Sequence, residues 1–145
     1  MTENDKFPLQ QFLPYLLNQA AEESSLEFQK AYKDRYGMLR TEWRVLFHLG
    51  IYGRMTAKDI GQRSKMHKTK ISRAVQRLAQ RRFLTRTQDD GDRRLEHLDL
   101  TPAGRTAYLD LREIAVDYDV KLSSILTKEE NVVLRQALVK LARMG

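Results

Sequence analysis

Between residues 56 and 100 the spacing of apolar residues changes from a helical period to a strand period, and this change constrains the fold most. Thr56 with Asp59 three residues later is typical of a capping box, which predicts a helix of one or two turns. After a break at residues 64–66, a second helix is predicted over about His67–Arg81, with one apolar face and one cationic and polar face. Two short helices joined by a tight turn indicate a helix-turn-helix.

Two strand-like segments follow, at residues 83–87 and 95–100. The loop between them, residues 88–94, contains Asp-Gly, which is typical of a β-hairpin turn. A hairpin placed directly after a helix-turn-helix predicts the wing of a winged helix.

Helical patterns flank this centre on both sides. The spacing predicts one long or kinked helix over about residues 8–35 and a second over about 41–51. Thr101 is placed to cap a helix that has Pro102 at its first position and continues towards Leu126. A last helix is predicted to open at Thr127, with Glu130 completing a capping box.

The predicted fold class is therefore mainly α: a winged helix-turn-helix with a small antiparallel β wing and long N- and C-terminal dimerisation helices. We expect a single domain over residues 1–145, with a DNA-binding lobe at 37–101 and helical dimerisation arms at 1–36 and 102–145. The arms have more apolar residues than a small lobe can cover, which indicates a subunit interface. A two-fold homodimer would place two recognition helices about one DNA turn apart (~34 Å), matching a pseudo-palindrome.

The positive charge is confined to one segment. Eleven of the 26 Lys and Arg residues, and only three acids, lie in residues 61–94, a net charge of +8 against +7 for the whole chain. Residues 1–60 are neutral and residues 95–145 carry −1. Such confinement indicates a surface for a polyanion, and nucleic acid binds such surfaces by releasing counterions.

The second helix of the helix-turn-helix holds the candidate DNA contacts, because a helix in the major groove reads bases with its N-terminal turns. The predicted DNA-binding residues of this helix are His67, Lys68, Thr69, Lys70, Ser72, Arg73 and Arg77. The later cations, Arg77 included, are expected to meet phosphates. The alternative is an ordinary solvated helix face, but such faces mix their charges, and no acid lies between residues 61 and 88.

Asp92 and Arg94 flank Arg93 at the predicted tip of the wing. An Arg at such a tip can enter a narrow minor groove, whose negative potential attracts it. Asp92 can hold the guanidinium of Arg94 through charge-assisted hydrogen bonds. The alternative is a plain polar turn with a local ion pair.

Residues 92–94 (Asp-Arg-Arg) and 98–104 (Leu-Asp-Leu-Thr-Pro-Ala-Gly) resemble the wing signature of the MarR family of bacterial regulators, and the likeness extends to residues 42–46 and 68–73. The resemblance implies a homodimeric winged-helix transcription factor, usually a repressor released by a small anionic or phenolic ligand. The chain departs from the family in having Phe83 where a Gly usually precedes the wing. Because the chain has no cysteine, the family's peroxide sensing cannot apply.

In similar regulators the effector lies between the dimer arms and the DNA-reading lobe. Tyr15, Trp43, Arg44 and His48 are the candidate ligand-binding residues there, because a cation can fix a carboxylate while aromatic rings cover the apolar part of an aromatic acid. The alternative is that Trp43 belongs to the core and Arg44 to an ion pair.

The remaining patterns exclude other classes. No catalytic elbow, phosphate loop or metal-ligand cluster is visible, so neither an enzyme nor a metal or other cofactor is expected. An RNA binder would need a stacking surface, but Phe83 is the single aromatic residue of the basic segment. A constitutive architectural nucleic-acid-binding protein without ligand control stays open. The polar start and the lack of an apolar span predict a soluble, cytoplasmic protein with no membrane partner.

Overall fold

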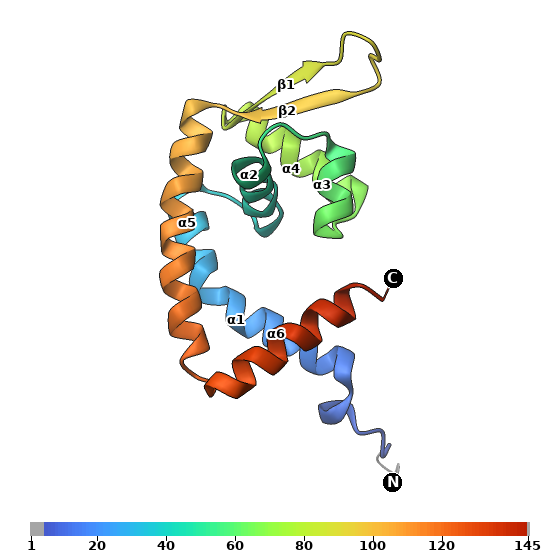
Figure 1. Ribbon diagram of the computed structural model, residues 1–145, viewed down its shortest axis with the longest axis vertical. Coiled ribbons are helices and arrows are strands. Elements are labelled where there is room, and N and C mark those ends of the chain that lie inside the picture. Colours follow the sequence, from blue (N-terminus) through green and yellow to red (C-terminus); the bar gives the residue numbers. More distant parts are fainter. Residues whose placement is uncertain (1–4, 145) are drawn as a thin grey trace.

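The computed structural model describes residues 5–144, which form a winged-helix lobe carried by long helices (Figure 1). Residues 1–4 and 145 of the predicted arms lie outside the described residues. The lobe comprises helices α2 (Arg40–Tyr52), α3 (Ala57–Ser64) and α4 (Lys68–Gln80) and strands β1 (Leu84–Gln88) and β2 (Glu96–Leu100). The arms comprise the 3-10 turn η1 (Leu9–Gln11) and helices α1 (Leu13–Tyr36), α5 (Pro102–Ser123) and α6 (Lys128–Ala142).

The core of the lobe forms where the apolar faces of α2, α3 and α4 meet β1 and β2. Helices α2 and α4 contribute buried residues at helical spacing, α3 contributes Ile60, and each strand contributes one buried leucine. Its most buried apolar members are Val45, Leu46, Leu49, Ile60, Ile71, Ala74, Leu78, Leu84 and Leu98. This core fixes the orientation of α4, whose opposite face is exposed.

The predicted capping box and wing are confirmed. Thr56 Oγ1 accepts the Asp59 N–H at 3.1 Å and the Asp59 carboxylate accepts the Thr56 N–H at 3.0 Å, which begins α3. The strands pair antiparallel, with Leu84 opposite Leu100 and Gln88 opposite Glu96. The wing therefore projects from the lobe as a two-stranded hairpin (Figure 1).

The junction between the wing and α5 depends on two residues of the motif at 98–104. Thr101 Oγ1 accepts the Gly104 N–H at 3.0 Å and donates to the Arg82 carbonyl at 2.7 Å. A Cβ on Gly104 would lie 1.9 Å from the Phe83 carbonyl oxygen, so the first turn of α5 packs this closely because residue 104 has no side chain. The left-handed backbone before the wing is at Arg82 (φ 64°), one residue before the predicted departure at Phe83.

The prediction of one helix over residues 8–35 is wrong at its start. The chain forms η1, bends at Phe12, and begins α1 at Leu13. The cause is Pro14, which has no backbone N–H and therefore favours the first turn of a helix. For this reason α1 begins beside Pro14 and does not extend back to residue 8. At the other end Gly37 takes the left-handed conformation (φ 61°) that closes α1, as predicted.

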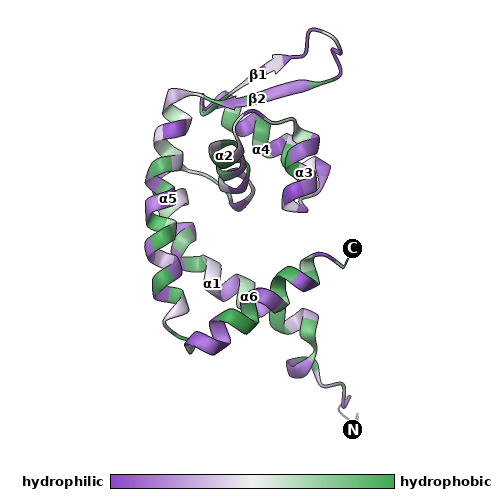
Figure 2. Cartoon of the chain, viewed as in Figure 1, coloured by the Kyte–Doolittle hydropathy of each residue, from purple (hydrophilic) through white to green (hydrophobic). Residues whose placement is uncertain are grey.

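The arms leave much of their apolar surface uncovered. α1 and α5 are joined by hydrogen bonds from Tyr36 to Asp110 and from Tyr118 to the Ser24 carbonyl. By contrast, α6 has no buried residue within its described span. Figure 2 shows hydrophobic residues recurring along α5 and α6. The exposed apolar residues of these two helices and the loop between them include Val116, Val120, Ile125, Val133, Leu134 and Leu138.

Candidate nucleic-acid interface and effector pocket

One face of α4 presents the predicted DNA-contacting residues to solvent. Ile71, Ala74, Val75 and Leu78 are buried, which turns the other face outward. The predicted residues on that outward face are all exposed: Lys68, Thr69, Lys70, Ser72, Arg73 and Arg77. Over residues 5–144, Lys68, Lys70 and Arg73 form no ion pair with an acid, so their charges are available to a ligand.

His67 precedes α4 and caps it. Its Nδ1 atom accepts the Thr69 N–H at 3.1 Å, which satisfies one of the free donors at the helix start. The remaining N–H groups and the helix dipole lie beside Lys68 and Lys70, so the start of α4 is strongly attractive to anions. His67 thus has a structural role besides the predicted contact.

Arg77 contacts a buried acid that the sequence did not single out. Its Nε lies 3.4 Å from Glu42 Oε2, and the Glu42 side chain is 0% exposed. The same carboxylate accepts the Leu39 N–H at 3.2 Å and so caps α2, while within residues 5–144 Glu42 Oε1 has no hydrogen-bond partner. The capping-box position of Glu42, three residues after Leu39, was the available signal.

Several other cations of the basic segment are engaged locally. The Arg63 guanidinium lies 3.9 Å from the centre of the Tyr52 ring. Arg86 pairs with Glu96 across the wing at 2.8 Å. Among the described residues, the cations of α4 that form no ion pair are Lys68, Lys70 and Arg73, which all lie in the first half of the helix.

In the wing, Asp92 and Arg94 meet as predicted. Arg94 Nε and Nη2 donate to the two Asp92 carboxylate oxygens at 3.1 and 3.2 Å, and the Arg94 N–H donates to Asp92 at 3.0 Å. These bonds to Arg94 lower the pKa of Asp92. The Arg94 side chain is 91% exposed, so the clamp presents the guanidinium to solvent.

Asp89 and His97 also shape the wing, and neither was predicted as a site residue. Asp89 Oδ2 accepts the N–H groups of Gly91 and Asp92 at 3.0 and 2.9 Å. Asp89 Oδ1 lies 2.8 Å from His97 Nε2. The hydrogen bond from His97, followed by those from the two backbone N–H groups, lowers the pKa of Asp89.

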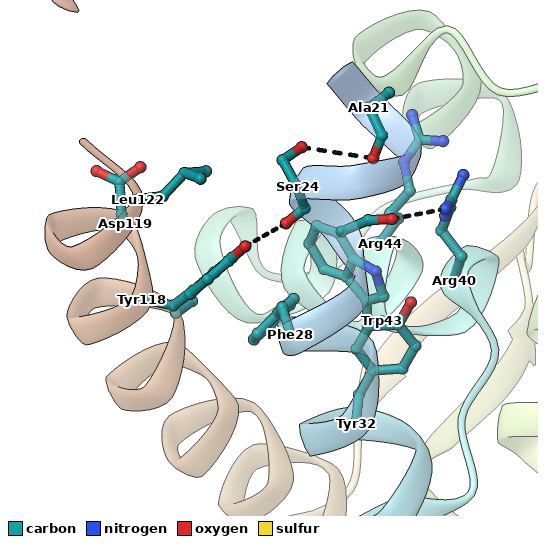
Figure 3. Close-up of a pocket in the computed structure, with 12 residues that line it drawn as sticks. Ala21, Ser24, Phe28, Tyr32, Arg40, Trp43, Arg44, Tyr118, Asp119 and Leu122 are labelled. Atoms are coloured by element: carbon teal, nitrogen blue, oxygen red, sulfur yellow. Dashed lines mark hydrogen bonds between the residues drawn. The ribbon is translucent and has the colours of Figure 1, made fainter. Parts of the chain in front are cut away.

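A pocket of about 470 Å³ lies between α1, α2 and α5 (Figure 3). Two of the four predicted ligand residues, Trp43 and Arg44, line it. Phe28, Tyr32 and Tyr118 give it aromatic walls, and the rings of Phe28 and Trp43 pack edge to face with their centres 5.2 Å apart.

The pocket is lined by two guanidinium groups, Arg40 and Arg44, and by one carboxylate, Asp119, and Arg40 also pairs with Glu22 at 3.7 Å. Burial and then repulsion from Arg40 lower the pKa of Arg44, so a negative charge placed between the two guanidinium groups would relieve that repulsion. Arg44 Nη2 donates to the Ser64 carbonyl at 3.0 Å, and Arg40 Nη2 donates to Ser25 Oγ at 2.9 Å. Tyr118 was missed in the sequence because α5 approaches α2 only in the fold, whereas Arg40 lies one turn before Arg44 on the same helix, so its spacing was an available signal.

Tyr15 and His48 do not line the pocket. Tyr15 lies in the first turn of α1, where its hydroxyl accepts from the Gln19 amide at 3.2 Å. His48 lies one turn after Arg44, with Nδ1 2.6 Å from the Arg44 carbonyl and its ring beside Tyr52. The structure therefore does not bring these two residues to Trp43 and Arg44 as a single site.

Within residues 5–144, no His, Asp and Glu side chains gather in a group of three that could hold a metal ion. None of the helices in that range is both long and apolar enough to cross a bilayer.

Comparison with known proteins gives matches over the lobe and over the whole chain. The model of the MarR family matches residues 36–95. A MarR family transcriptional regulator from Silicibacter pomeroyi is 30% identical, with a TM-score of 0.78, and the match covers 94% of this chain and 99% of that protein. The similarity thus includes both the lobe and the arms.

Two further solved structures share the fold. BpsR of Bordetella bronchiseptica, whose DNA binding is regulated by 6-hydroxynicotinic acid, is 21% identical with a TM-score of 0.87, over 97% of this chain and 100% of that one. A MarR mutant from E. coli complexed with operator DNA is 18% identical with a TM-score of 0.82, over 95% and 99% of the two chains. At these identities the comparison shows the fold alone.

Proposed function

Because this chain belongs to the MarR family of transcriptional regulators, we propose that it is a homodimeric repressor released from a pseudo-palindromic operator by a small aromatic or phenolic acid. The family establishes a DNA-binding regulator with a winged helix, and not an enzyme. The observation that carries the proposal is the exposed, unpaired cationic face at the start of α4.

In this proposal α4 enters the major groove. Arg73 pairs with a guanine edge, Thr69 meets a thymine methyl or a phosphate, and Lys68 and Lys70 neutralise phosphates. The Nε of Arg77 faces Glu42, so Arg77 would bind the DNA phosphate backbone through its outer N–H groups. Arg94 enters the adjacent minor groove from the wing, clamped by Asp92.

The uncovered faces of the arms support the homodimer. Val116 and Val120 of α5, with Leu134 and Leu138 of α6, expose apolar surface that a monomer would leave in water. We assign residues 1–36 and 102–145 to this interface and residues 37–101 to the DNA-binding lobe. A two-fold pair then carries two copies of α4 to successive major grooves, about 34 Å apart.

The pocket between α1, α2 and α5 supports control by an aromatic acid. Arg40 and Arg44 would hold the carboxylate, and Trp43 and Tyr118 would cover the ring (Figure 3). Because the pocket joins the arms to α2 of the lobe, a ligand there can favour one spacing of the two lobes over another. The DNA binding of BpsR, which shares this fold, is regulated by an acid of this class.

The test begins with DNA fragments selected from the native genome by the purified protein. We expect 6-hydroxynicotinate or 4-hydroxyphenylacetate to raise the melting temperature and to weaken binding of the selected duplex. Arg40→Gln should abolish both responses while unliganded binding stays unchanged, and Lys140→Gln, on α6 outside the pocket, serves as the control. Duplex binding that no such acid alters would instead support a constitutive architectural protein.

A further inference from the structure

The loop of the wing is organised around one carboxylate. Asp89 directly follows β1, and its Oδ2 accepts two backbone N–H groups of the loop, from Gly91 and Asp92. Two charge-assisted bonds to successive turn residues fix the backbone of an exposed hairpin that would otherwise sample many conformations.

His97 holds that carboxylate from the opposite strand. Its Nε2 lies 2.8 Å from Asp89 Oδ1, and because a carboxylate only accepts, Nε2 carries the proton. His97 lies in β2 opposite Thr87, and its side chain is 25% exposed. The anchoring side chain therefore belongs to the paired part of the wing rather than to its loop.

The loop in turn aims Arg94. Asp92 donates its N–H to Asp89. Its two carboxylate oxygens accept hydrogen bonds from the Arg94 guanidinium. The bonds form one continuous path from His97 through Asp89 and Asp92 to a guanidinium that is 91% exposed.

We propose that Asp89 and His97 are positioning residues that pre-organise Arg94 for the minor groove, and so contribute to the preference for A·T-rich flanking DNA. The inference rests on the proposed function of the wing. An Arg held in its bound geometry loses less conformational entropy on binding than one on a free loop. A carboxylate near DNA repels phosphates, so Asp89 and Asp92 oppose binding by charge and favour it by geometry.

Because charge and geometry act in opposite directions, the sign of the change in DNA affinity distinguishes the electrostatic role from the positioning role. Asp89→Ala and Asp90→Ala each remove one negative charge from the same loop, but Asp90 is exposed and makes no side-chain bond among residues 5–144. We expect Asp90→Ala to bind duplex DNA as well as wild type or slightly better. Asp89→Ala should bind A·T-flanked sites about 3- to 10-fold more weakly, and His97→Ala should show a smaller loss of the same kind.

A double-mutant cycle with Arg94→Ala completes the experiment, measured by titration on sites with A·T and G·C flanks. In the Arg94→Ala background, Asp89→Ala should change the affinity for DNA by less than about 2-fold, because no guanidinium is left for Asp89 to position. The positioning role is overturned if Asp89→Ala strengthens DNA binding as Asp90→Ala does, or if it lowers the affinity by the same factor with and without Arg94. In either case the minor-groove role of Arg94 stands. If Arg94→Ala alone binds both flanks like wild type, the proposed function of the wing fails first.

Discussion

The winged-helix lobe buries its apolar residues more completely than the helical arms do. In the lobe, Leu46, Ile60 and Leu78 are completely buried, and the helices begin at satisfied caps. In the arms, Val120 is 67% exposed and Ile125 is 77% exposed. The lobe thus buries its apolar residues together with the inner parts of α1 and α5, such as Tyr32 and Leu111, whereas the far parts of the arms leave apolar surface exposed.

This contrast separates the tasks of the two regions. The buried core lets the lobe hold the exposed cations of α4 in fixed positions, which the recognition of a DNA sequence requires. In the proposed dimer the arms would set the distance between two such lobes, and a ligand in the pocket between arms and lobe would alter that distance.

The largest effect is expected at the junction of the two regions. Gly104→Ala would place a Cβ 1.9 Å from the Phe83 carbonyl oxygen, a backbone atom that can move only if α5 shifts away from the wing. We expect a loss of about 3 kcal/mol or more in the free energy of unfolding by denaturant. Gly91→Ala is the control, since its Cβ would meet only Asp89 Oδ2 at 3.4 Å. Equal stability of the two variants would show that this close packing is not needed.

Next come charges placed on the uncovered face of the arms. Leu134→Glu combined with Leu138→Glu puts two carboxylates one helical turn apart on α6, and their burial in an interface would be costly. Sedimentation equilibrium should give a dimer dissociation constant at least ~100-fold higher, while the melting of the lobe changes little. The exposed pair Lys128→Glu and Lys140→Glu is the control. If the variant with both Leu134→Glu and Leu138→Glu dimerises like wild type, the interface does not include this face of α6.

On the lobe, Arg73→Ala should separate binding from stability. Because Arg73 is exposed and unpaired among the described residues, its loss should change the unfolding free energy by less than about 0.5 kcal/mol. Binding of the specific site should weaken by about 1–3 kcal/mol, with relaxed base preference at one position per half-site. Arg143→Ala, on the arms, should leave binding intact. Uniform weakening on all sequences would instead make Arg73 a phosphate contact.

A smaller effect is expected where α1 meets α5. The Tyr36 hydroxyl donates to Asp110 at 2.7 Å, and burial followed by this bond raises the pKa of Tyr36 to about 12. Because this value exceeds the ordinary value of 10.0, the stabilisation is complete below pH 10 and is lost as the pH rises towards 12. Tyr36→Phe should cost about 1 kcal/mol at neutral pH and flatten this alkaline loss in denaturant titrations. A variant with the wild-type alkaline profile would show that Tyr36 does not contribute.

The same contrast explains how far the sequence could predict the structure. Caps and turns depend on residues three or four apart, so Thr56 with Asp59 and Thr101 with Gly104 could be read directly. Contacts between distant segments could not: the Glu42–Arg77 pair and the approach of Tyr118 to α1 exist only once the helices pack. The same limit applies to the pocket, where Trp43 and Arg44 were predicted together with Tyr15 and His48, which lie elsewhere.

The central claim is that the exposed cations of α4, together with Arg94 of the wing, bind duplex DNA and gain much of their affinity from its phosphates. Measuring affinity for a selected duplex as a function of salt tests this claim most directly. If the dimer contacts about 6–10 phosphates, affinity should fall roughly 1,000- to 100,000-fold between about 50 and 200 mM salt. Single-stranded RNA of the same sequence should bind far more weakly at every salt concentration. A duplex affinity that hardly changes over this range, or an equal affinity for the RNA, would contradict the account.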